Sequence, residues 1–76
     1  MPKFPVIKAK KLVTILIRIG FVQHGDMNGS HLVLKHNDGR RTTIPVHGKE
    51  IPIGTLMAIL KDIKVSRDDF FNLVNL

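Results

Sequence analysis

Residues 30–46, SHLVLKHNDGRRTTIPV, contain two alternating segments joined by a turn signal. Apolar and polar side chains alternate along residues 30–36, which is the period of a β-strand with one buried face. Residues 37–39, Asn-Asp-Gly, are a turn signal of the kind that joins two strands of a hairpin. Residues 40–46 alternate again. The stretch therefore predicts an antiparallel hairpin with one face turned to a core.

The alternation assigns each side chain of the hairpin to a face. The core face carries Leu32, Leu34, Thr42, Ile44 and Val46, and the opposite face carries His31, Val33, Lys35, Arg41 and Thr43. Because an antiparallel sheet needs only one face for the core, the other face can meet solvent or a ligand. Pro45 lacks a backbone N–H, so we expect it near an edge or a strand end. The pairing across the two strands depends on the hairpin register, which the pattern leaves open.

Two further elements are predicted before the hairpin. Residues 9–19 carry apolar side chains at helical spacing, and Gly20 suits the position just after a helix end. Two additional isoleucines widen the apolar stripe, so a strand is the alternative for this segment, with Gly20 favouring the helix. Residues 21–26 are predicted as a short strand anchored by Phe21, and Asn28-Gly29 as a tight turn.

Two helices are predicted after the hairpin. Residues 54–63 have an apolar face, and Ser66 begins a last short helix with Asp69 in a capping-box-like position. The order of helix, three antiparallel strands, helix and short helix predicts an α+β fold with helices on one face of the sheet. Residues 1–76 are expected to form one domain, because the chain is too short for two. The apolar residues within 70–74 either close the core or bind a partner.

The chain is basic, and its excess positive charge is uneven. Lys and Arg total 12 against 6 Asp and Glu, a formal net charge of +6. Residues 1–49 contain nine of the basic residues and only two of the acidic ones. A basic surface of this kind suits a polyanionic partner, either a nucleic acid or an acidic protein. The hydrophobic fraction of 43% is enough for a small core and argues against disorder.

Composition also excludes several kinds of site. There is no cysteine, so disulfides, thiolate zinc sites and cysteine nucleophiles are excluded. The four histidines lack the paired spacing of a metal site, so neither a metal nor another cofactor is expected. No apolar run approaches the roughly 20 residues that span a bilayer, and the N-terminus lacks the features of a signal peptide. We therefore expect a cytoplasmic protein with no membrane partner.

His31 is the candidate for acid–base chemistry on the face away from the core. In RNA cleavage the ribose 2′-OH loses a proton as it attacks the adjacent phosphorus, and the 5′-oxygen gains one as it leaves. A positioned histidine can carry either proton and typically contributes about 10²–10⁴-fold in rate. The substrate supplies its own nucleophile, so no metal is required, and DNA, which lacks the 2′-OH, would not be cut. A structural or simply exposed histidine is the alternative that the pattern leaves open.

Four short motifs occur in an order and spacing typical of one protein family. They are IGF (19–21), NGSHLVLKH (28–36), GRRTTIPVH (39–47) and EIPIGTL followed by ILK (50–61). Together they resemble the HicA-type toxins, and the resemblance covers residues 5–72, nearly the whole chain. Each motif is short, but four in the right order are specific.

The resemblance implies the α-β-β-β-α fold of a double-stranded RNA-binding domain. It implies a toxin that cleaves mRNA as its substrate and is paired with a HicB-type antitoxin that covers the site. The toxin is then not expected to bind DNA by itself, but only as part of the complex with the antitoxin. The catalytic histidine of the family's Gly-Ser-His motif maps onto His31. The family often has a basic residue just before this motif, where this chain has Met27-Asn28, which weakens the expectation of RNA contacts at that turn.

Six other residues are candidates for contact with phosphate groups. Four are basic and two lie at the start of the helix predicted over residues 54–63: Lys35, Arg40, Arg41, Lys49, Gly54 and Thr55. Basic side chains commonly bind phosphates, and the free N–H groups at a helix N-terminus can do so too. Solvated charges and an ordinary helix cap are the alternatives.

Gly29 and Ser30 are predicted to shape the turn and the start of the strand. Adjacent strand residues face opposite ways, so a Ser30–His31 dyad is not expected. The three other histidines, His24, His36 and His47, are predicted to be surface residues, although each is a candidate for an additional proton carrier. The second proton-transfer group stays open between water and one of these histidines.

Three hypotheses for the function follow. The first is an endoribonuclease toxin that uses His31. The second is a binding module in which the same fold holds structured RNA without cutting it. The third is a protein-interaction domain whose basic face docks an acidic partner. The intact Gly-Ser-His sequence favours the enzyme.

Overall fold

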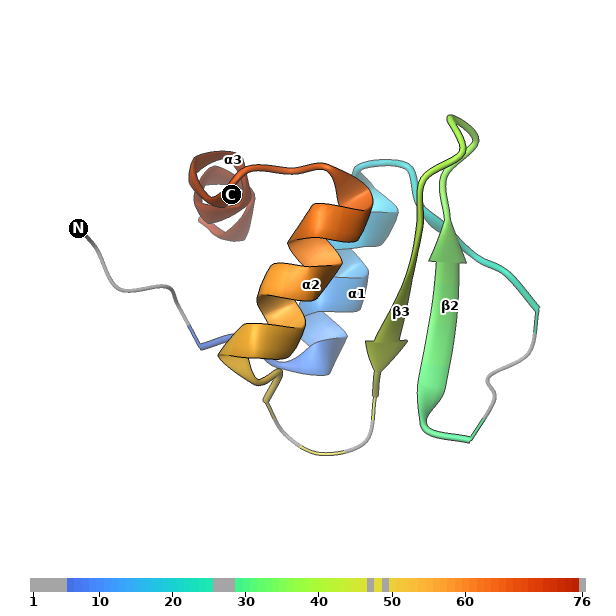
Figure 1. The fold of residues 1–76 in the computed structure, drawn as a ribbon, viewed down its shortest axis with the longest axis horizontal. Helices are drawn as coiled ribbons and strands as arrows, with labels where there is room; N and C mark the ends of the chain where they lie inside the picture. The colour runs from blue at the N-terminus through green and yellow to red at the C-terminus, as the bar shows by residue number, and fades with distance from the viewer. Residues whose placement is uncertain (1–5, 26–28, 47, 49, 76) are drawn as a thin grey trace.

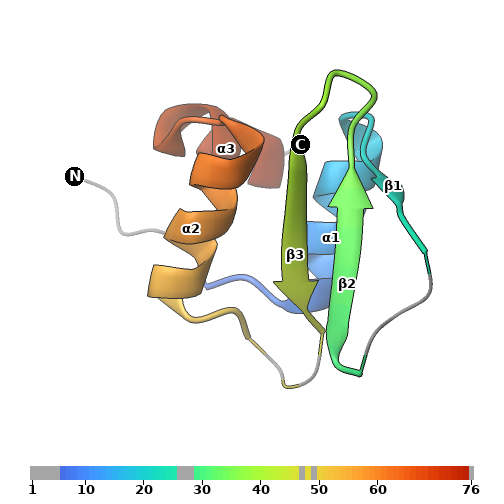
Figure 2. The same ribbon diagram turned by 45° about the vertical axis from the view of Figure 1, so that its right-hand side comes forward.

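The predicted hairpin provides the central strand and one edge strand of a three-stranded sheet in a computed structural model that describes residues 6–25, 29–46, 48 and 50–75. β2 (His31–Lys35) pairs antiparallel with β3 (Arg41–Pro45), with Leu32 opposite Ile44 and Leu34 opposite Thr42. β1 (Val22–Gln23) pairs antiparallel with the other edge of β2, which gives the strand order β1-β2-β3 (Figure 2). The short strand predicted over residues 21–26 is thus confirmed at Val22–Gln23.

The core lies between the sheet and two helices. α1 (Ala9–Arg18) and α2 (Ile53–Ile63) lie side by side on one face of the sheet, which we call the inner face (Figure 1). The largest fully buried side chains lie in α1, α2, β2 and β3, in the segment before β1 and in the C-terminal part of the chain: Phe21, Phe70, Leu12, Ile15, Leu16, Leu34, Ile44, Leu56 and Ile63. The alternation of the hairpin therefore predicted its inner face correctly, and helices cover that face as expected.

The end of α1 decides between helix and strand for residues 9–19. Ile19 caps the helix, and Gly20 follows with a φ of +106°, a conformation that side-chain-bearing residues rarely adopt. A Cβ atom at Gly20 would lie 2.7 Å from Nε2 of His36. Two features therefore favour glycine at this position: the backbone conformation and the close approach of the His36 imidazole.

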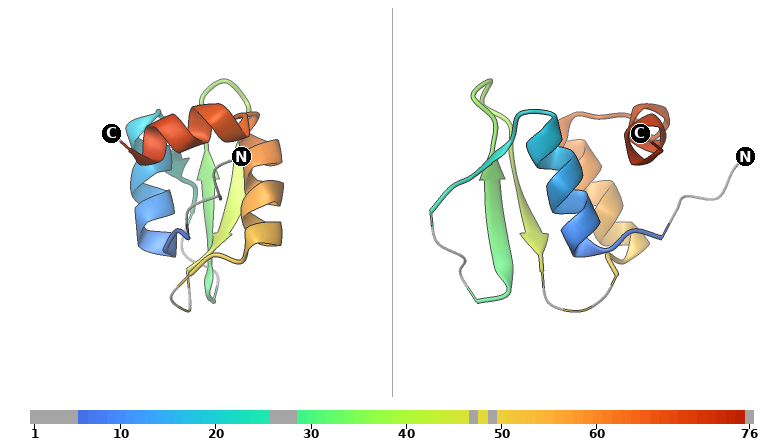
Figure 3. Two further views of the ribbon diagram at one scale, coloured as in Figure 1. Left: turned by 90° about the vertical axis from the view of Figure 1, so that its left-hand side faces the viewer. Right: turned by 180° about the vertical axis from the view of Figure 1, so that it is seen from behind.

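α3 (Arg67–Val74) lies on the side of α1 and α2 away from the sheet (Figure 3). Its predicted cap is confirmed, because the Ser66 hydroxyl accepts a hydrogen bond from the Asp69 N–H at 3.1 Å. Phe70 is fully buried, so the apolar tail closes the core at this residue. The complete order, α-β-β-β-α with a short C-terminal helix, is the predicted fold class.

Pro45 is the last residue of β3, an edge strand, which is the position predicted for it. α2 begins at Ile53, one residue before the predicted start. Within the described parts of the chain, no helix has the length and apolar character needed to cross a membrane.

Candidate functional site

The sheet face opposite the helices gathers the residues predicted for it. This outer face is formed by His31, Val33, Lys35, Arg41, Thr43 and Pro45. The register places Lys35 opposite Arg41 and His31 opposite Pro45, so the side chains of each pair share one face. His31 and Arg41 are exposed, and Lys35 is half-buried. The structure therefore brings one imidazole and two cations together on one surface.

His31 and the two cations lie at opposite ends of the outer face. Lys35 is four residues from His31 along β2, which corresponds to about 13 Å at a rise of about 3.3 Å per residue. Val22 of β1 pairs with Lys35, so the far end of the face is a row of one apolar and two basic side chains across three strands. The cations are therefore placed to contact a different part of a chain-like ligand from the part that His31 contacts.

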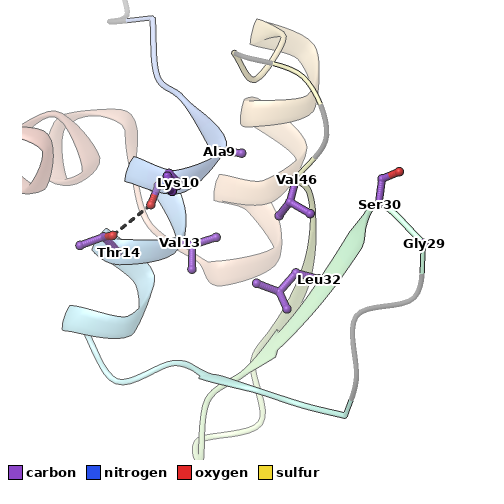
Figure 4. Close-up of a pocket in the computed structure, with 8 residues that line it drawn as sticks. All are labelled: Ala9, Lys10, Val13, Thr14, Gly29, Ser30, Leu32 and Val46. Carbon is purple, nitrogen blue, oxygen red and sulfur yellow. Dashed lines mark hydrogen bonds between the residues drawn. The ribbon is translucent and has the colours of Figure 1, made fainter.

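Ser30 lies toward the inner side of β2, away from His31. It lines a pocket of about 600 Å³ between the start of α1 and the start of β2 (Figure 4). The other lining residues are Ala9, Lys10, Val13, Thr14, Gly29, Leu32 and Val46. This placement agrees with the expectation that Ser30 and His31 face opposite ways. Gly29 has a φ of +63°, a conformation that favours glycine, which suits its predicted role in shaping the turn.

The N-terminus of α2 lies in the helix layer, at the end of the molecule where β2 begins (Figures 1 and 2). Gly54 is exposed and Thr55 is half-buried in its first turn. In this fully described segment the helix start has no side-chain cap and no acidic residue. Lys49, the basic residue predicted near this helix start, lies outside the described residues, as do His47 and Met27-Asn28.

A comparison of the sequence with models of known protein families identifies the family of this chain. Residues 9–65 match the family described as the HicA toxin of bacterial toxin–antitoxin systems. The chain belongs to the HicA toxin family. The matched residues contain α1, the three strands and α2, and α3 follows them. The search of curated proteins gives no match.

Family membership makes the chain the toxin of a toxin–antitoxin system and implies a cognate antitoxin as its partner. In this HicA-family chain the outer face is the one surface on which the structure collects several of the predicted site residues within the described segments. Among those segments, no three histidine or carboxylate side chains come together as a metal site requires.

Arg40 of the HicA fold is directed away from the outer face, unlike its neighbour Arg41. Its Nη1 donates to the Ile63 carbonyl at 2.6 Å, and its Nε donates to Oδ2 of Asp38 at 2.8 Å. The guanidinium also lies over the Phe21 ring, with Cζ 5.1 Å from the ring centroid. Arg40 thus ties the hairpin turn to the end of α2. The structure does not bring it together with His31.

His36 has a comparable structural position and is only 18% exposed in its side chain, contrary to the surface position predicted for it. Its Nε2 lies 3.2 Å from the Ile19 carbonyl, and its Nδ1 lies 3.1 Å from the Asp38 backbone N–H. A neutral imidazole with its proton on Nε2 satisfies both partners. The ring packs edge-on against Phe21 at a centroid distance of 5.1 Å.

Asp38 completes this turn. Its Oδ1 accepts a hydrogen bond from the Arg40 backbone N–H at 3.0 Å, and this bond is the main reason why the pKa of the Asp38 carboxyl lies below its ordinary value. The ion pair with the Arg40 side chain acts in the same direction. The roles of Arg40 and His36 were missed at the sequence level. For Arg40 a signal was available, because it shares the alternation of Thr42 and Ile44 and therefore belongs to the inner side.

Proposed function

We propose that this HicA-family toxin is a metal-independent endoribonuclease that cleaves mRNA on the outer face of its sheet. The observation that carries the proposal is the register of β2 and β3, which puts the exposed imidazole of His31 on the same face as Lys35 and Arg41. An exposed imidazole beside a basic surface suits a substrate that is both a polyanion and in need of proton transfer.

His31 carries a proton in the reaction that we propose. The 2′-oxygen forms a bond to the adjacent phosphorus, its proton leaves, and the bond between phosphorus and the 5′-oxygen breaks as that oxygen gains a proton. The products are a 2′,3′-cyclic phosphate and a 5′-hydroxyl end. His31 takes the first proton or gives the second, because a neutral imidazole accepts a proton and an imidazolium donates one.

Lys35 and Arg41 bind phosphates of the RNA chain away from the cleaved bond. Their distance from His31, about 13 Å along the strand, makes them positioning contacts for a neighbouring nucleotide. Gly54 and Thr55 at the start of α2, and Lys49 outside the described residues, are further proposed phosphate contacts. Arg40 is left out of this set because its guanidinium is bonded to Ile63 and Asp38.

The cognate antitoxin, which we propose to be of the HicB type, inhibits the toxin by covering the outer face. Acidic side chains facing Lys35 and Arg41, with apolar or polar groups over His31, would complement this surface. The toxin then meets DNA only through the antitoxin complex.

The first prediction is that the purified chain cleaves an mRNA in the presence of EDTA and leaves DNA of the same sequence whole. His31→Ala should lower the cleavage rate by at least about 100-fold, since it removes a proton carrier. His31 is exposed, so the variant should keep the wild-type circular dichroism spectrum and unfolding midpoint.

Cleavage products with 2′,3′-cyclic phosphate ends would agree with attack by the 2′-OH. Intact RNA after incubation with folded, partner-free wild-type protein contradicts the enzyme. RNA binding without cleavage would then identify an RNA-binding module, and no RNA binding at all a protein-interaction domain.

A further inference from the structure

The outer face extends one residue beyond Gln23, the last residue of β1. Val22 lies opposite Lys35 and Gln23 lies opposite Leu34, and the next backbone hydrogen bond runs from the His24 N–H to the Val33 carbonyl at 2.9 Å. This bond continues the antiparallel ladder in the same register. His24 is therefore held opposite Val33 by the sheet, although it lies just outside the assigned strand.

Alternation along β1 settles which face His24 occupies. Phe21 is fully buried, so residues of odd number in this segment face the inner side. Gln23 lies opposite the buried Leu34, so its side chain belongs to the inner side as well. Val22 is 63% exposed on the other side. His24 follows Val22 in this alternation and is also exposed, so its imidazole belongs to the outer face.

His24 and His31 are thereby diagonal neighbours on that face. His24 lies opposite Val33, and His31 is two residues from Val33 along β2. The Cα atoms of diagonal neighbours across two antiparallel strands are about 7–8 Å apart, and their Cβ atoms are somewhat closer. Two imidazoles at that separation can contact opposite sides of one phosphodiester group, in contrast to the pair formed by Lys35 and Arg41 at the far end of the face.

We propose that His24 is the second proton-transfer residue of the ribonuclease reaction, paired with His31. The inference rests on the proposed ribonuclease function and names the group that this function left open. Cleavage of RNA moves two protons, one from the 2′-OH and one to the 5′-oxygen. With two imidazoles, one takes the first proton while the other, already protonated, supplies the second. No net proton is consumed, and the two histidines exchange protonation states.

Among the described residues, the charged groups on the same face are few. There, Lys35 and Arg41 are the cations of the outer face, and they lie at the end of the sheet remote from His31. Asp38 and Arg40 are engaged with each other at the hairpin turn. A reaction that needs one neutral and one protonated imidazole loses rate both when the pH is low enough to protonate both rings and when it is high enough to deprotonate both.

The second prediction concerns His24→Gln, assayed for RNA cleavage in EDTA from about pH 5 to pH 9. We expect kcat to fall by about 10²–10⁴-fold with little change in KM, since a proton carrier is lost and a polar side chain remains. We also expect the bell-shaped pH profile of the wild type to lose one of its two limbs. The backbone bond to Val33 is kept in this variant, so the fold should be unchanged.

Gln23→Ala is the matched control, because Gln23 lies on the same short strand with its side chain on the other side. This control should cleave RNA at the wild-type rate. Combining His24→Gln with Gln23→His moves the imidazole by one residue to the wrong face, and it should restore no activity.

The inference is overturned if His24→Gln cleaves within about threefold of the wild type, or if its activity falls while both limbs of the profile stay. The latter result would make His24 a binding contact. These outcomes are distinct from failure of the proposed function, in which the wild type itself does not cleave RNA.

Discussion

Arg40 and Arg41 are adjacent in sequence and have opposite surroundings. Arg40 is bonded to the Ile63 carbonyl and packed over Phe21, whereas Arg41 is exposed on the outer face. From the sequence, both arginines are predicted to contact phosphates. The local sequence at the start of a strand does not show which distant acceptor a guanidinium group reaches. The acceptor of Arg40 lies 23 residues away in the chain. The two residues therefore offer a matched test of structural against functional roles.

The third prediction compares Arg40→Ala with Arg41→Ala. Arg40→Ala should lower the free energy of unfolding by about 1–3 kcal/mol, because it removes a charge-assisted hydrogen bond and leaves a carbonyl unpaired. Arg41→Ala should change it by no more than about 0.5 kcal/mol and should instead weaken RNA binding. Urea unfolding and RNA titration of both variants measure the two effects. Equal stability losses would contradict this division of roles.

In the hairpin turn, the Asp38 carboxylate accepts hydrogen bonds from both the backbone and the side chain of Arg40. Asp38 accepts from the Arg40 backbone, and the His36 imidazole accepts from the Asp38 backbone, so three residues of the turn are bonded to one another. The pKa of Asp38 is lowered chiefly by the backbone bond from Arg40. The folded protein therefore binds fewer protons at this carboxyl than the unfolded chain does around pH 4.

The fourth prediction is a pH dependence of stability carried by this turn. A lowered pKa in the folded state means that the stabilisation is complete above the ordinary pKa of the carboxyl and is lost as the pH falls through the folded pKa. Asp38→Asn should flatten this part of the curve of unfolding free energy against pH, measured by urea unfolding from about pH 6 to pH 2.5. Parallel curves for the variant and the wild type would show that Asp38 is equally protonated in both states.

Elements with a local signal were predicted well, and those that depend on distant partners were not. The period of the hairpin placed Leu32 and Leu34 inside, and Gly20 marked the end of α1, because both signals lie within a few residues. His36 shares the alternation of Leu32 and Leu34, which indicates the inner side, but its partner there, the Ile19 carbonyl, is 17 residues away and has no local signal. The outer position of His24 depends on the pairing of β1 with β2, a register that composition does not specify.

The distribution of charge over the whole molecule connects the two proposed partners. The sheet presents Lys35 and Arg41 on the face that the helices leave uncovered. The helices carry further exposed cations (Lys10, Lys11, Arg18 and Lys61), and α3, on the far side of the helix layer, has two acidic residues in its first turn (Figure 3). If the proposed RNA and an acidic antitoxin both bind the outer face, they compete for one side of the protein. The strength of both interactions should depend on salt, because each exchanges bound ions for charged contacts.

The fifth prediction uses this salt dependence to locate the RNA. In the His31→Ala background, which binds without cutting, the logarithm of the binding constant should fall linearly with the logarithm of salt concentration. Lys35→Gln and Arg41→Gln should each reduce the slope by about 0.7, the contribution of one contact with a single-stranded phosphate. Lys61→Gln, at an exposed position of α2 in the opposite layer, removes the same charge and should leave the slope unchanged. If Lys61→Gln reduces the slope as much as the sheet variants do, the RNA is held by the overall charge of the protein and the outer face is not its binding site.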